Sequence, residues 1–135
     1  MKDRSHDPQL LKGVLRMLVL QVLTDEETYG YELVTRLTDR GLSGISTGTV
    51  YPVLNRLERD GLLGSRLVAS SAGPARKYYA VTAKGASALG EAIGGWQDLV
   101  AAVDAVLASG SIHATTTAAA EQAAEDSAIT KGKNS

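Results

Sequence analysis

STGTVYPVLNRLERDGLL, residues 46–63, is the stretch that decides the fold of this chain. Apolar residues recur in it at helical spacing until Gly61 ends the pattern, which predicts an amphipathic helix beginning at Ser46 or Thr47. The expected core-facing residues are Val50, Val53, Leu54, Leu57 and, after the helix, Leu62. The opposite face carries Thr47, Thr49, Tyr51, Asn55, Arg56 and Arg59. Such hydroxyls, amides and arginines reach base edges and phosphates in a DNA major groove, although an ordinary amphipathic helix has a similar composition.

Two short strands are predicted directly after this helix, over residues 62–68 and 76–82. The segment 69–75 between them is rich in turn formers, so we expect a β-hairpin with a loose tip. Alternation along the second strand predicts that Tyr79 and Val81 face the core and that Arg76 faces DNA. Lys77 lies close enough to the tip to reach a phosphate as well. With Arg66, these cations form a basic flap beside the helix.

Two further helices are predicted before residue 46. Asp7 is the expected N-cap of the first, with Pro8 at its first position, and it runs to about Thr24. Thr28 is the expected cap of the second, which Gly41 ends. Three helices followed by a hairpin is the order of a winged helix. The predicted fold class is therefore mainly α with a small β-hairpin: a winged helix-turn-helix followed by a long C-terminal dimerisation helix.

A long helix is predicted from Thr82 to about Ser109. Large apolar residues recur along it at spacings of four and three, at Leu89, Ile93, Trp96, Val100, Val103 and Leu107. This is a heptad seam, which favours pairing with the same helix of a second subunit. Packing on the first helix of the same chain is the alternative, and both are compatible with the pattern.

The chain divides by composition into three parts. Residues 1–82 are expected to form a winged helix-turn-helix DNA-binding domain, and residues 83–109 a dimerisation helix. Residues 110–135 are rich in Ala and Thr with almost no large apolar side chain, so we expect a disordered tail. The charge divides likewise. Residues 1–85 hold 12 Lys and Arg against 9 Asp and Glu, a net charge of +3, whereas residues 86–135 hold 2 against 6, a net charge of −4.

The sequence contains no motif that indicates a catalytic site. The chain has no cysteine, and its two histidines, His6 and His113, lie in predicted tails without metal-ligand spacing. No nucleophile elbow, phosphate loop or dinucleotide fingerprint is present. We therefore predict a non-enzyme without metal or cofactor. The polar amino-terminal segment and the absence of a long apolar run indicate a cytoplasmic protein that does not enter the membrane.

The sequence resembles the PadR family of bacterial transcriptional regulators. Three stretches carry the likeness: GVLRMLVLQVLTDEETYGYEL (13–33), residues 46–63 quoted above, and GPARKYYAVTAKG (73–85). The single C-terminal helix is similar to the short subfamily. The resemblance implies a homodimeric repressor that binds a double-stranded DNA operator with an inverted repeat. It implies a recognition helix at 47–60 and a wing at 63–82. The matching DNA-reading positions are Thr47, Gly48, Thr49, Tyr51, Pro52, Asn55 and Arg56, with Arg76 and Lys77 in the basic wing.

Trp96, the only tryptophan, hints at an effector. In multidrug-responsive members of the family that the chain resembles, a tryptophan at a similar place stacks planar ligands at the dimer centre. A core aromatic that fills the interface is the alternative. We expect a cavity for a planar aromatic effector that releases DNA. Its lining would be Leu11, Leu15, Leu89, Ile93, Trp96 and Val100, with Asp98 near enough to contact a cationic ligand.

A winged-helix module that binds protein instead of DNA is the second functional class. It predicts an acidic or apolar recognition face. Arg56, Arg59, Arg76 and Lys77 argue against it, because they make that face basic.

Overall fold

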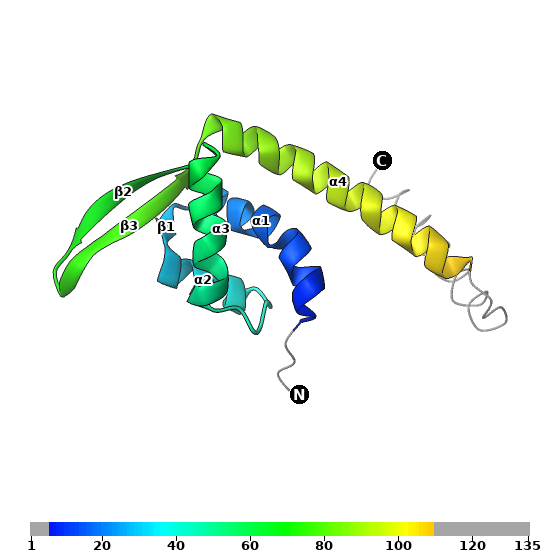
Figure 1. Cartoon of the computed structure of the whole chain (residues 1–135), viewed down its shortest axis with the longest axis horizontal. Coiled ribbons are helices and arrows are strands. Elements are labelled where there is room, and N and C mark those ends of the chain that lie inside the picture. Colours follow the sequence, from blue (N-terminus) through cyan, green and yellow to red (C-terminus); the bar gives the residue numbers. More distant parts are fainter. Residues whose placement is uncertain (1–5, 110–135) are drawn as a thin grey trace, which may run out of the picture. The chain divides into compact units, whose positions relative to one another are not determined.

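The computed structural model describes residues 6–109, and its first helix begins where the sequence predicts. Helix α1 (Pro8–Asp25) has Pro8 at its first position, and the Asp7 carboxylate accepts a hydrogen bond from the Gln9 amide at 2.8 Å. Figure 1 shows the order of the elements that follow. The predicted mainly helical fold with a small hairpin is confirmed.

The start of the second helix differs from the prediction. Thr28 does not cap it; Thr28 and Tyr29 form a short strand, β1 (Thr28–Tyr29), and α2 (Gly30–Asp39) follows with no side-chain cap bond. Strand β1 pairs antiparallel with a later strand, Thr28 opposite Tyr79 and Tyr29 opposite Tyr78. The backbone groups of Thr28 are thus used by a sheet partner 51 positions later in the chain, which local capping patterns do not reveal.

Helix α3 (Thr47–Arg59) has the predicted bounds. The Ser46 hydroxyl caps it by accepting a hydrogen bond from the Thr49 amide at 3.3 Å. Gly61 ends it with a φ of +81°, a left-handed conformation that a side chain disfavours.

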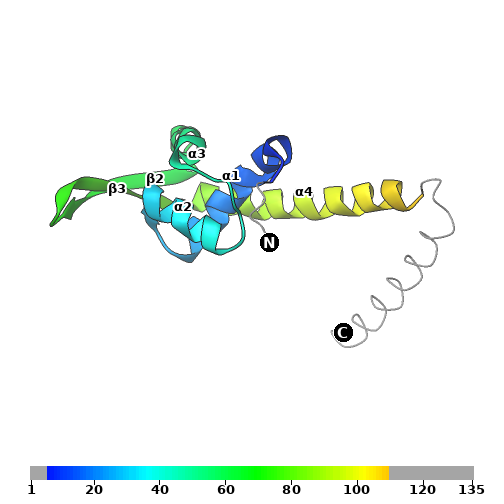
Figure 2. The same cartoon turned by 90° about the horizontal axis from the view of Figure 1, so that it is seen from below.

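The wing is longer and its tip tighter than predicted. Strands β2 (Leu63–Ser70) and β3 (Gly73–Val81) leave only Ser71 and Ala72 as the connection, so the expected loose loop over 69–75 is wrong. The sheet order is β1-β3-β2, and the β2–β3 ladder carries an irregularity between Val68 and Ser70. The strands extend away from the helices (Figure 2). Small residues were interpreted as turn formers, but backbone pairing continues through them.

The core lies where α1, α2 and α3 meet the base of the sheet. The predicted inner residues of α3, Val50, Leu54 and Leu57, are completely buried, and Val53 packs against the same cluster. Tyr79 is buried with them, as the strand alternation predicts, and Val81 packs beside it. This packing holds α3 on the helices behind it while its other face stays exposed.

A hydrogen-bonded corner joins the end of α3 to the start of α4 (Ala83–Ala108). The Thr82 hydroxyl donates to the Gly61 carbonyl at 2.7 Å and accepts from the Gly85 amide at 3.0 Å, so Thr82 caps α4 as predicted. A Cβ at Gly85 would overlap the Leu62 carbonyl oxygen. The corner is therefore closely packed, and glycine is needed at position 85.

The chain divides into two compact units at Gly94 and Gly95. The first unit contains the winged helix and the first turns of α4, and the second contains the remainder of α4. The predicted tail, 110–135, and His113 lie outside the described residues. Between residues 6 and 109, no helix has the length and apolarity that a bilayer crossing requires.

Candidate nucleic-acid interface

The outer face of α3 is open to solvent along its length. Of the residues that the sequence nominates for DNA, Gly48, Thr49, Tyr51, Pro52, Asn55 and Arg56 are exposed, and Thr47 is half-buried at the first position. A helix that buries one side and exposes hydroxyl, amide and guanidinium groups on the other can enter a major groove.

Tyr51 is held in place by a glycine on α2. A Cβ built at Gly30 would come within 2.6 Å of three atoms of the Tyr51 side chain, so the ring lies directly over this glycine. Tyr51 nevertheless keeps 39% of its surface exposed. Gly30 in the Gly-Tyr-Glu-Leu motif therefore allows the tyrosine to pack closely on the helix behind it while one edge remains available.

The base of the wing carries a stack of aromatic and cationic side chains. The Arg76 guanidinium lies 4.6 Å from the ring centroid of Tyr29, and the Tyr29 and Tyr78 rings are 5.3 Å apart. The Arg66 guanidinium lies 5.8 Å from the ring centroid of Tyr78 and forms a salt bridge with Glu27. Arg76 is exposed and has no acidic partner among residues 6–109, so its charge is not neutralised.

Lys77 points back to helix α3. Its ammonium group lies 3.0 Å from the Glu58 carboxylate of α3, which also accepts a hydrogen bond from the Ser65 hydroxyl. These hydrogen bonds lower the pKa of Glu58, and Glu58 in turn raises the pKa of Lys77. The structure thus ties Lys77 to α3, whereas the sequence suggested a lysine that reaches out to phosphate.

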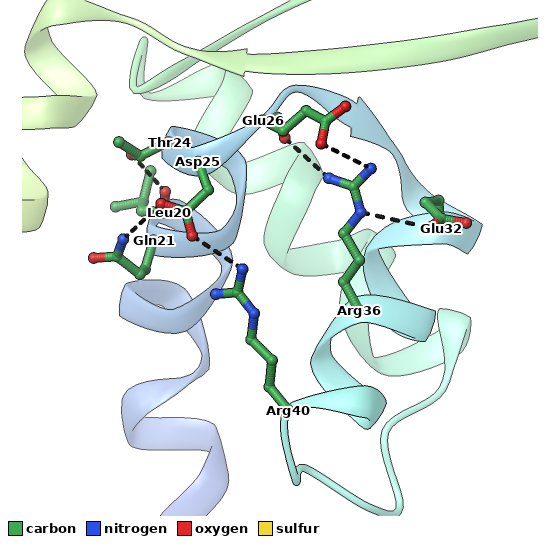
Figure 3. Close-up of polar contacts among 8 residues, drawn as sticks. All are labelled: Leu20, Gln21, Thr24, Asp25, Glu26, Glu32, Arg36 and Arg40. Carbon is green, nitrogen blue, oxygen red and sulfur yellow. Dashed lines mark hydrogen bonds and ion pairs between the residues drawn. The ribbon is translucent and has the colours of Figure 1, made fainter.

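The arginines of α2 are also neutralised within the chain. Figure 3 shows Arg36 between Glu26 and Glu32, at 3.5 and 3.4 Å, and Arg40 paired with Asp25 at 3.0 Å. The contacts with Glu26 and Asp25 connect α2 to the end of α1, whereas the contact with Glu32 lies within α2. In contrast, Lys12, Arg16, Arg56, Arg59 and Arg76 form no salt bridge with any described residue. Most of the described cations without a salt bridge thus lie on α1, α3 and the wing; Lys84 of α4 has none either, but its ammonium group donates to the Asp60 carbonyl at 2.9 Å.

The predicted seam of α4 behaves differently at its two ends. Leu89 is buried and Ile93 packs against the core of the same chain, which is the intramolecular alternative for this end. Val100 is half-buried, whereas Trp96, Val103 and Leu107 expose 43%, 44% and 70% of their surfaces. Leu99 and Val106, which the seam pattern omitted, are exposed too and widen the apolar face.

The residues predicted for an effector are distributed over both compact units. Leu15 is in the core, and Leu11, Leu89 and Ile93 pack there as well. Trp96 and Asp98 are exposed and Val100 is half-buried in the second unit. A common cavity for all seven remains a prediction.

Several residues of the interface were not predicted. Tyr29, Tyr78 and Glu58 position the wing cations, and Gly30 positions Tyr51. The Thr-Tyr-Gly-Tyr run was visible in the sequence, but its role depends on β1 pairing with β3.

Comparison with known proteins gives a consistent match. The model of the transcriptional regulator PadR-like family matches residues 19–91, more than half of the chain. The transcriptional regulator Rv3488 of Mycobacterium tuberculosis is 39% identical over 80 residues, which cover 59% of this chain and 73% of that protein.

Solved structures show the same likeness. A PadR-like transcriptional regulator from Bacillus cereus is 42% identical, covering 76% of this chain and 99% of its own, with a TM-score of 0.66. A PadR family regulator from Eggerthella lenta is 39% identical, covering 76% of this chain and 89% of its own, with a TM-score of 0.71.

Proposed function

The chain belongs to the PadR-like family of transcriptional regulators, and from this premise we propose that it is a homodimeric repressor that binds an inverted-repeat operator. In this proposal α3 enters the major groove and the wing contacts the flanking backbone. The proposed DNA-contacting residues are Thr47, Gly48, Thr49, Tyr51, Pro52, Asn55 and Arg56 on α3, with Arg76 and Lys77 on the wing as phosphate contacts.

The exposed outer face of α3 carries the proposal. Arg56 and Arg59 lie on it without an acidic partner in the described chain, and Arg76 adds a third such charge on β3. Unneutralised arginines beside exposed hydroxyl and amide groups suit phosphate contact combined with base readout. A protein-binding module would not need this basic face.

A binding assay with the DNA upstream of the chain's own gene tests the proposal. Affinity should fall steeply as salt rises, because several phosphate contacts release counterions. Footprinting should then show an inverted repeat with half-sites about one helical turn, roughly 34 Å, apart. A flat salt response in a protein that binds a peptide or protein ligand would favour the second functional class.

We expect the wing to contact phosphates and helix α3 to determine the sequence preference. Arg76→Ala should weaken binding to all duplexes alike, because a phosphate contact carries no sequence information. Asn55→Ala and Tyr51→Ala should change the preference among operator variants. Equal effects of all three substitutions in a competition assay would contradict this division.

The exposed apolar part of α4 supports the proposed dimer. Trp96, Val103 and Leu107 lie at heptad spacing, and a second copy of the helix would cover them. Sedimentation should therefore show a dimer, and Val103→Glu should dissociate it. A monomeric wild-type chain at working concentration would remove this part of the proposal.

We further propose that a planar aromatic ligand at Trp96 releases the operator by changing the distance between the two recognition helices. The 43% exposure of Trp96 in the single chain supports it, because the indole is open to a stacking ligand. Quenching of its fluorescence by planar compounds, lost in Trp96→Ala, is the expected signal. Failure of a broad panel to quench would count against it.

A further inference from the structure

A cleft separates the first half of α1 from the recognition helix. It has a volume of about 630 Å³, which is within the range of small-molecule sites, roughly 300–1,000 Å³. Leu11, Val53 and Leu57 contribute an apolar lining. Both helices belong to the first compact unit, and in Figure 2 the start of α1 and α3 lie on the same side of that unit.

The lining of this cleft is also cationic. Lys12 and Arg16 from α1 and Arg56 from α3 border it. None of the three forms a salt bridge with a residue between 6 and 109, whereas Arg36 on α2 and Arg40 directly after it are both neutralised. Three unpaired cations around an apolar cavity are complementary to a ligand that has an apolar body and a negatively charged group.

A glycine in the middle of α1 leaves room beside these cations. Gly13 borders the cleft, and a Cβ built there would have no neighbouring atom within 4 Å. Glycine in a helix interior costs about 1 kcal/mol relative to alanine. No packing contact in the described chain requires it, so its contribution at this position is open space.

We propose that the cleft between α1 and α3 binds an amphipathic organic anion, with an apolar ring or chain on the leucine and valine lining and a carboxylate or sulfonate at Lys12, Arg16 and Arg56. This site shares Leu11 and Leu15 with the predicted effector lining, but neither Trp96 nor any other residue of α4 borders it. Thr49, Pro52 and Arg56 belong both to its lining and to the proposed DNA-reading face, so a bound anion competes with DNA. The competition, but not the binding, rests on the proposed function.

A titration of the isotope-labelled full chain with 2-naphthoate tests the site without DNA. Backbone amide signals of Gly13 and Gly44, which both border the cleft, should shift and saturate, while the Trp96 indole signal stays in place. The neutral 2-naphthamide should bind at least about tenfold more weakly, because it lacks the charge-assisted hydrogen bonds. Shifts confined to Trp96, or equal binding of the amide, would overturn the proposal.

Two matched arginine substitutions test whether the ligand's negative charge is bound at the cleft. Arg16→Gln should raise the dissociation constant of 2-naphthoate about tenfold, the change expected for one charge-assisted contact. Arg40→Gln is the control, since it removes the same charge from an arginine that already pairs with Asp25, and it should leave naphthoate binding unchanged. Equal effects of the two substitutions would show that net charge, not the cleft, attracts the ligand.

The same titration distinguishes other occupants. If a second copy of the chain covers the cleft in the dimer, Gly13 and Gly44 will not respond to 2-naphthoate at any concentration. If the cations serve DNA phosphates instead, Arg16→Gln will weaken DNA binding in a chain that ignores naphthoate. Either result overturns the anion site.

Competition is measured last, with an operator duplex. Saturating 2-naphthoate should lower DNA affinity at least about tenfold, and the response should shrink in Arg16→Gln relative to that variant's own affinity without ligand. Naphthoate binding with unchanged DNA affinity would refute the competition. A chain that binds naphthoate but no duplex would refute the proposed function and leave the site intact.

Discussion

The arginines of α2 and those of α3 differ in their surroundings. Arg36 pairs with Glu32 of its own helix and with Glu26, and Arg40, directly after α2, pairs with Asp25; the contacts with Glu26 and Asp25 connect α2 to the end of α1. Arg56 and Arg59 face solvent, and no described carboxylate pairs with them. One residue type thus forms salt bridges at a helix junction in one place and remains without an acidic partner within residues 6–109 in the other, where we propose that it contacts DNA. A count of charges along the sequence treats them alike.

Substitution of Arg56 and Arg59, the two arginines of α3 without acidic partners in the described chain, should give the largest change in DNA affinity. Arg56→Gln combined with Arg59→Gln should lower DNA affinity by about 10- to 100-fold at moderate salt, because two phosphate or base contacts are lost. The slope of log affinity against log salt should become shallower by about 1 to 2. Fluorescence anisotropy with a labelled operator measures both. An unchanged slope would mean that these arginines do not contact phosphate.

Gly30→Ala should come next, because it disturbs α3 without changing any charge. A methyl group there would lie about 2.5 Å from the Tyr51 ring, so the ring must move. We expect operator affinity to fall about tenfold, whereas affinity for random DNA changes little, since base contacts carry the discrimination. The matched control is Gly90→Ala on α4, outside the proposed DNA-contacting face, where the added carbon would have no neighbouring atom of the described residues within 4 Å. Equal losses on both DNAs would argue for general unfolding.

Substitution of a paired arginine should affect stability instead. Arg36→Gln removes contacts with Glu26 and Glu32, and the free energy of unfolding should fall by about 1 kcal/mol. Urea unfolding followed by circular dichroism measures it. DNA affinity should stay within about twofold of wild type. A loss comparable to that of the α3 substitutions would abolish the distinction between the two regions.

The smallest change in DNA affinity is expected at Lys77, a wing cation that already has an acidic partner on α3. Glu58→Gln should free this lysine and raise affinity for random DNA about two- to fivefold, as for one added phosphate contact. Because the pKa of Glu58 is lowered in the folded chain, its stabilising contribution is present above the ordinary value of 4.5 and is lost as pH falls below it. The stability difference between wild type and Glu58→Gln should therefore shrink from pH 6 to pH 3. A constant difference would show that the Lys77 contact does not depend on the carboxylate charge.

Helix α3 was predictable because its signals are local. The apolar spacing, the Ser46 cap and the Gly61 stop all lie within 16 residues, and each was confirmed. Strand β1 was missed because it has only two residues, Thr28 and Tyr29, which is too short for a periodic pattern. They are extended because β3 supplies their backbone partners. The tight wing tip was missed for a related reason: small residues do not reveal whether backbone pairing continues through them.

The polar contacts of the site were also unpredictable where they join residues that are far apart in the sequence. Arg66 and Glu27 are 39 positions apart, and only the sheet brings them together. The sequence therefore indicated which residue types face outward, but not which cations are neutralised. Heptad spacing likewise fitted both packing modes of the last helix, and Leu89 turned out to be buried in its own chain.

The corner at Gly61, Thr82 and Gly85 has a mechanical consequence. The first turn of α4 touches the backbone at the end of α3, and both ends of the wing, Leu63 and Val81, are paired beside it. Because these contacts are close, a rotation of the first turn of α4 would be transmitted directly to the backbone at the end of α3 and at the base of the wing. If α3 and the wing contact DNA as proposed, a rotation of this single helical turn would displace both of them, so a regulatory input at the corner would alter both proposed DNA contacts together.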